Sequence, residues 1–155
     1  YFEDKMDVLR YIFQDTKRQY QDFCRETLVD SGGDFWKMVA ELFHQVLYRD
    51  YSGRLARLFQ NVLTYAEAEK FVKILRESGG DGKKMDEWMY EQVDKSQLRI
   101  ESLEEFRVLI EMCMLAILMA FAQRYKDKES IESVEWSFFR KMDFLKNGVL
   151  KHKES

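Results

Sequence analysis

Glu41 and His44 are the two residues whose types and spacing come closest to those of a metal-binding active site. A Glu and a His three positions apart lie on one face of a helix, and helical bundles bind two iron ions with paired motifs of this kind. Such a site needs a second pair and two further carboxylates, yet the other histidine, His152, lies in a polar tail. The sequence therefore favours a partly buried or ligand-facing His44 over a metal site, and a metal-dependent bundle enzyme is the weakest interpretation.

No other residue pattern indicates catalysis. A nucleophilic Ser or Cys needs an adjacent base, and the chain has two histidines and no Gly-x-Ser-x-Gly turn. The glycines at 79, 80 and 82 lack the Lys-Ser/Thr of a phosphate-binding loop, so residues 77–82 are predicted to be a connector. Cys24 and Cys113 lack metal-binding spacing and are predicted to be buried thiols. We expect a protein that is not an enzyme and needs no cofactor or metal.

The composition predicts one all-α domain over residues 1–155. The chain has no Pro and seven Gly, and a net charge of -3 gives no electrostatic basis for holding DNA by itself. Its longest apolar run, 112–122, is shorter than the roughly 20 residues that span a bilayer. Together with the two expected thiols, this predicts a cytoplasmic protein with no membrane segment.

Apolar periodicity and capping residues predict a bundle of seven or eight helices. Asp34 can cap the second helix, Ser130 can cap the last, and Gly148 can end it. Ser102 followed by Glu105 forms a capping box. The predicted helices cover residues 4–30, 35–49, 55–63, 65–76, about 85–93, 103–125 and 131–148.

The last two predicted helices carry more apolar surface than one small domain is expected to cover. Residues 108–122 are apolar on all sides except at Glu111, which either pairs with Arg107, the favoured interpretation, or faces a cavity and selects a cationic ligand. A helix without a polar face must be covered on every side. We therefore predict that these two helices contact a partner chain, with interface residues Met114, Ile117, Phe121, Phe138, Phe139, Met142 and Leu145.

Aromatic and Met side chains exceed what a Leu/Ile core would use. Each one alone is most simply a core residue, but as a set they indicate an adaptable apolar cavity. The alternative is a helical interaction domain without a ligand, in which the aromatic residues only fill the core and the last two helices bind a different protein. The predicted ligand-binding residues are Trp36, Phe43, His44, Phe59, Trp88, Met89, Met112 and Met119.

The first nine residues carry a more specific signal. Tyr1, Phe2, Lys5, Val8 and Leu9 match a pattern of an aromatic or His, Phe, two residues, Lys, two residues and an apolar pair. This pattern resembles the junction between the DNA-binding head and the body in the tetracycline repressor (TetR) family, although Val8 stands where Leu is commoner. Residues 144–150 are also similar to the end of the last helix in many members.

The resemblance implies the C-terminal, ligand-binding and dimerising body of a bacterial transcriptional regulator. In such a body, the last two helices pair with those of a second copy, as a homodimer with a four-helix bundle. It implies a helix-turn-helix head upstream of Tyr1, with Tyr1 and Lys5 contacting DNA phosphate. A small apolar or amphipathic effector would enter the body, shift the first helix and release a repressor from its operator DNA. The effector, the operator and the direction of regulation are not readable from these residues.

Overall fold

The helices of the computed structural model confirm an all-α fold. It describes residues 5–48 and 80–150, with side chains from 18–48 and 85–150, and these ranges contain no strand. The helices predicted over 55–63 and 65–76, and with them Phe59, lie outside the described residues. The elements are α1 (Lys5–Asp30), α2 (Phe35–Tyr48), α5 (Gly80–Gln92), the short 3₁₀ helix η1 (Lys95–Gln97), α6 (Leu103–Tyr125) and α7 (Ile131–Asn147).

The turn between α1 and α2 requires glycine. Gly32 and Gly33 have positive φ angles of 69° and 90°, and the Gly33 N–H donates to the Leu28 carbonyl at 2.8 Å. A Cβ on Gly33 would lie 2.5 Å from the Gln92 carbonyl oxygen. The Asp94 N–H in turn donates to the Gly33 carbonyl at 2.8 Å, so this turn also holds the end of α5.

The predicted caps are present at the helix ends. The Lys37 N–H donates to Asp34 Oδ1 at 3.1 Å, and Ser130 Oγ accepts from the Ser133 N–H at 3.2 Å. Gly148, with φ 78°, ends α7. These contacts satisfy backbone groups that a helix end leaves unpaired, which is why the predicted boundaries agree with the observed ones.

One predicted boundary is wrong. Residues 80–82 were expected in a connector, but α5 begins at Gly80. The first N–H groups of a helix have no partner within it, so glycine weakens a first turn less than a helix interior. The connector prediction therefore counted glycines without considering their position in the following helix.

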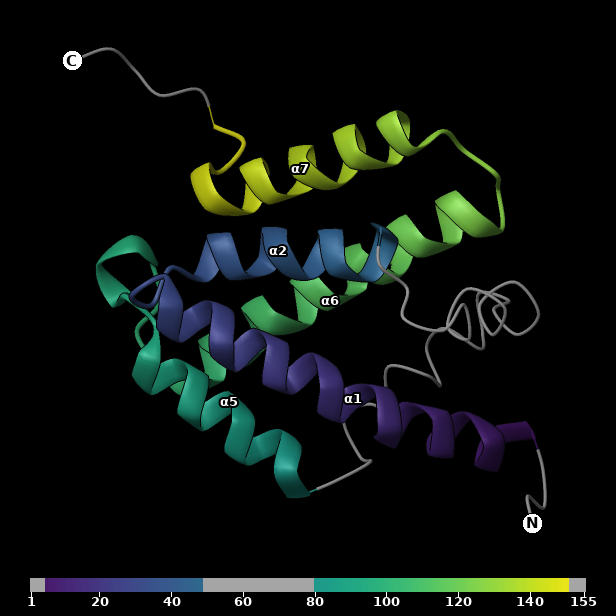
Figure 1. The fold of residues 1–155 in the computed structure, drawn as a ribbon. Coiled ribbons are helices and arrows are strands. Elements are labelled where there is room, and N and C mark those ends of the chain that lie inside the picture. Colours follow the sequence, from purple (N-terminus) through teal and green to yellow (C-terminus); the bar gives the residue numbers. More distant parts are fainter. Residues whose placement is uncertain (1–4, 49–79, 151–155) are drawn as a thin grey trace.

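The five α-helices of the described ranges pack around an aromatic core. In Figure 1, α2 lies between α1 and α7, α5 lies along α1, and α6 crosses behind α2. α6 contacts α5, α2 and α7. The rings of Phe43 on α2 and Phe138 on α7 stack with centroids 4.0 Å apart, and both side chains are fully buried. The other large side chains that are fully buried are Phe35, Phe106 and Phe121, together with Leu28 and Val134.

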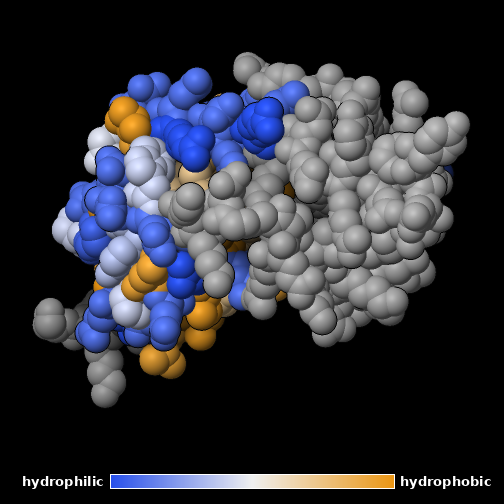
Figure 2. Space-filling model, turned by 90° about the horizontal axis from the view of Figure 1, so that it is seen from below, coloured by the Kyte–Doolittle hydropathy of each residue, from blue (hydrophilic) through white to orange (hydrophobic). Residues whose placement is uncertain are grey.

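One side of α6 is not covered by the described chain. Val108, Met112, Leu115 and Met119 are 43% to 57% exposed, and their spacing of four, three and four places them along one face. We call these four residues the outer stripe. Among the coloured residues of the face seen from below in Figure 2, hydrophilic side chains predominate, with separate hydrophobic patches at the upper left and in the lower part of the view. In the described ranges, none of the helices is long and apolar enough to cross a membrane.

Candidate functional site

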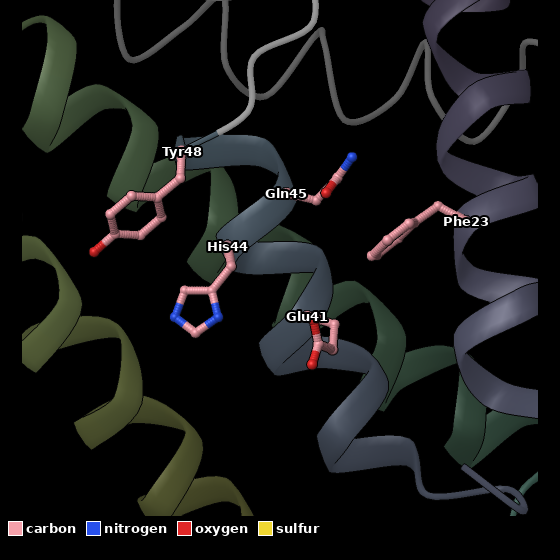
Figure 3. Close-up of a pocket in the computed structure, with 5 residues that line it drawn as sticks. All are labelled: Phe23, Glu41, His44, Gln45 and Tyr48. Carbon is pink, nitrogen blue, oxygen red and sulfur yellow. The ribbon is translucent and has the colours of Figure 1, made fainter. Parts of the chain in front are cut away.

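A cavity of about 400 Å³ opens beside the second half of α2. Four of its lining residues occupy successive turns of that helix, with spacing of three, one and three, and the fifth comes from α1. Figure 3 shows Phe23 pointing from α1 towards α2 and Gln45 pointing back towards α1. We call this space the α1–α2 cavity, and it is lined by Phe23, Glu41, His44, Gln45 and Tyr48.

Two of the lining residues connect the cavity to α7. The Tyr48 hydroxyl donates to Glu135 Oε2 at 2.8 Å, and His44 Nε2 lies 3.7 Å from Glu135 Oε1. In Figure 3 both side chains point away from α1, towards α7. The hydrogen bond to Glu135 raises the pKa of Tyr48, and burial and the charges of Glu135 and Glu132 raise it further, whereas Arg124 lowers it. Glu135 thus joins the cavity wall to the last helix.

A smaller groove of about 230 Å³ lies between α2 and α7. Trp36 and Ala40 form its α2 wall, and Phe139, Met142, Asp143 and Lys146 form its α7 wall. The Trp36 indole N–H is buried and has no acceptor within the described ranges. A buried donor without an acceptor destabilises the fold by about 1–3 kcal/mol, so this groove is a less satisfied environment than the rest of the core.

The structure separates the predicted ligand residues. His44 lines the α1–α2 cavity and Trp36 lines the smaller groove. Phe43 and Met89 are buried in the core, and Trp88 packs against it. Met112 and Met119 line neither space, because both belong to the outer stripe of α6. The described members of this set therefore do not line one common cavity, as the sequence analysis had expected.

The predicted interface residues also differ in how far the chain itself buries them. Ile117, Phe121, Phe138 and Met142 are buried within this one chain, because their sides of α6 and α7 face the core. Phe139 and Leu145 pack partly against that core, and Met114 is exposed. Of the two predicted phosphate-contacting residues, Tyr1 lies outside the described residues, and only the backbone of Lys5 is described.

The cysteines are buried thiols, as predicted. Cys24 and Cys113 are free, and burial raises the pKa of each thiol from 9.0 to about 12. The described side chains include no group of three or more His, Cys, Asp or Glu that could hold a metal ion. Glu41 and His44 instead share the wall of the α1–α2 cavity.

The sequence analysis missed Phe23, Gln45, Tyr48 and Glu135. A signal for two of these residues was present, because Gln45 and Tyr48 lie with Glu41 and His44 at helical spacing on a helix whose one other charged residue is Lys37. Such a polar line on one face marks a surface in contact with water or a ligand. No comparable signal identifies Phe23 or Glu135, because their roles depend on how α1 and α7 pack against α2.

Comparison with known proteins agrees with this architecture. A family model, the tetracyclin repressor-like C-terminal domain, matches residues 34–149, which is more than half of the chain. Neither the curated proteins nor the solved structures give a match. Domains of this family are regulatory rather than enzymatic, and they bind ligands and dimerise in TetR regulators. The chain therefore belongs to the family of tetracycline repressor-like C-terminal domains.

Proposed function

We propose that residues 1–155 form one domain that senses a small apolar or amphipathic effector and dimerises as the body of a DNA-binding regulator. The regulator is a repressor that its effector releases from operator DNA. Its helix-turn-helix head lies upstream of Tyr1, with Tyr1 and Lys5 next to the phosphates. The observation that carries the dimeric part is the outer stripe of α6.

The α1–α2 cavity supports the sensing role. Its volume of about 400 Å³ falls within the range of roughly 300–1,000 Å³ typical of small-molecule sites. One wall belongs to α1, the helix that follows the junction pattern at residues 1–9. An effector that binds better to one position of α1 than to another shifts the population towards that position. The cavity is therefore placed to change the direction in which α1 leaves the body.

The outer stripe supports a homodimer, with a second copy of this chain as its occupant. The four apolar residues form a continuous line on α6, and Trp136, at 70%, and Phe144 on α7 are also exposed. Apolar surface of this kind is stabilised when a partner removes it from water, at about 25 cal/mol per Å². We therefore assign Met112 and Met119 to the dimer surface and leave Ile117, Phe121, Phe138 and Met142 in the core.

Sedimentation equilibrium of Leu115→Glu tests this assignment. Burying an unpaired carboxylate in an apolar interface is unfavourable, so the dimer dissociation constant should rise at least about a hundredfold. Val29→Glu is the matched control, because Val29 is similarly exposed but lies on α1. It should leave the dissociation constant unchanged. A Leu115→Glu protein that dimerises as tightly as the wild type would remove the outer stripe from the interface.

A further inference from the structure

The α1–α2 cavity combines aromatic rings with acidic groups. Phe23 and Tyr48 contribute aromatic rings to its wall, His44 contributes an imidazole, and Glu41 contributes a carboxylate. In Figure 3 the Glu41 side chain lies between Phe23 on one side and His44 on the other. Aromatic faces attract organic cations, and a nearby carboxylate adds charge attraction. The lining therefore has the two components with which proteins bind ammonium groups.

Glu41 is available for such a ligand. It is exposed, and the structure gives it no hydrogen bond or ion pair within the described ranges. A cation beside it would not have to displace a partner already bound to the carboxylate. This distinguishes Glu41 from Arg107, whose guanidinium already lies 3.6 Å from both Asp86 and Glu87.

The charges near Tyr48 have the same sign. Glu135 accepts the Tyr48 hydrogen bond, and both Glu135 and Glu132 act on that hydroxyl as negative charges against the single positive charge of Arg124. Arg124 is also engaged, because its Nη1 donates to the Glu129 carbonyl at 3.0 Å. An anionic ligand would meet repulsion here, whereas a cationic one would not.

We propose that the effector is an amphipathic organic cation that lies along the polar line of α2, with its apolar body in contact with Phe23 and Tyr48 and its ammonium or amidinium group beside Glu41. This rests on the proposed function, because it assigns a ligand class to the same α1–α2 cavity. The basis is the juxtaposition of the Glu41 carboxylate with the aromatic rings of Phe23 and Tyr48 in one cavity. The acid that selects the cation is therefore Glu41, rather than Glu111 on α6.

Three probes with the same apolar body test the charge preference by calorimetry: octyltrimethylammonium, octanol and octanesulfonate. The cation should bind about tenfold more tightly than octanol. This difference combines a cation–π contribution with a screened charge attraction to Glu41. Octanesulfonate should bind most weakly. Added salt should weaken binding of the cation but not of octanol, because salt screens the exposed charge of Glu41.

Glu41→Gln should weaken binding of octyltrimethylammonium about fivefold and leave octanol unchanged. Glu91→Gln is the matched control, since it removes the same charge from an exposed position on α5. Tyr48→Ala should weaken binding of both probes, because both would lie against its ring. Both variants should fold, because Glu41 and Tyr48 are exposed. Circular dichroism checks this.

The outcomes separate the ligand class from the site. If octanol binds as tightly as the cation and Glu41→Gln has no effect, the charge preference is overturned. A loss of octanol binding in Tyr48→Ala would then still support the cavity as the effector site. If none of the probes binds, or if Tyr48→Ala changes nothing, the proposed effector site itself is overturned, and the inferred ligand class with it.

Discussion

The inner and outer faces of α6 have similar residue types but different surroundings. Phe106, Cys113 and Ile117 on the inner face are buried by α2, α5 and α7, whereas the outer stripe is about half exposed. The chemistry of the side chains does not distinguish the two faces. What distinguishes them is which face the rest of the chain covers, so a helix that is apolar on all sides indicates two partners rather than a deeper core.

The same contrast appears between α6 and α2. α2 has one polar line, formed by Lys37, Glu41, His44, Gln45 and Tyr48, and the α1–α2 cavity lies along the last four of these residues. α6 has no polar line from 108 to 122 apart from Glu111, and its outer stripe lines neither the α1–α2 cavity nor the smaller groove. The difference associates the sensing site with the amphipathic helix and the proposed dimer surface with the apolar one.

The largest difference between the two faces of α6 should appear in thiol chemistry. Burial raises the pKa of Cys113 from 9.0 to about 12, which leaves roughly a thousandfold less reactive thiolate than an ordinary cysteine has at neutral pH. A Leu115→Cys variant adds a thiol on the outer stripe, two residues away. At low protein concentration the introduced thiol should react rapidly with a chromogenic disulfide reagent, while the wild-type chain reacts very slowly.

Protein concentration sharpens this test. When the dimer forms, the introduced thiol should become protected, whereas Cys113 should react slowly at every concentration. Equal reaction rates for the wild type and the variant would contradict the assignment of the two faces. Unfolding in urea should expose all the thiols and bring their rates together, which confirms that burial is the cause.

The raised pKa also has a consequence for stability. The native thiol of Cys113 keeps its proton up to about pH 12, while in the unfolded chain it ionises near its ordinary value of 9.0. The contribution of this thiol to the free energy of unfolding is therefore complete below pH 9 and decreases between pH 9 and 12. A Cys113→Ala chain should lack this part of the pH dependence.

A matched pair of alanine substitutions compares how much the inner and outer faces of α6 contribute to the free energy of unfolding. Ile117→Ala removes buried atoms and should lower the free energy of unfolding by about 2–5 kcal/mol. Leu115→Ala removes exposed atoms and should change it by less than about 0.5 kcal/mol. Urea denaturation at protein concentrations below the dimer dissociation constant measures both. A comparable loss in the two variants would mean that the outer stripe is packed within the single chain.

The helices could be predicted from the sequence because their signals are local. Periodic apolar residues and the caps at Asp34, Ser102 and Ser130 depend on neighbours within one turn, so the observed boundaries follow them closely. The start of α5 at Gly80 was mispredicted because glycine content alone does not show whether a residue begins a helix or precedes it.

Which side of each helix is buried could not be predicted in the same way. Met112 and Ile117 are both apolar residues of α6, and only the positions of α2, α5 and α7 decide that Ile117 is buried while Met112 is exposed. The predicted cavity residue Phe43 became a core residue for the same reason, through its stacking on Phe138. Tertiary packing therefore determined the site, and the polar line on α2 was its one local signal.

A smaller loss than that of Ile117→Ala is expected at the N-terminal cap of α6, which stabilises both faces of the helix. Ser102 Oγ accepts from the Glu105 N–H at 3.2 Å, and the Glu105 carboxylate accepts from the Glu101 N–H at 2.7 Å. Ser102→Ala should lower the free energy of unfolding by about 1 kcal/mol. Because a cap stabilises the helix itself, the dimer dissociation constant should stay nearly unchanged.

Ser133→Ala on α7 is the control, since Ser133 takes part in its cap only through its backbone N–H. Urea denaturation and sedimentation equilibrium on the same variants measure the two quantities. A tenfold weaker dimer in Ser102→Ala would mean that the first turn of α6 belongs to the interface, and would extend the proposed surface beyond the outer stripe.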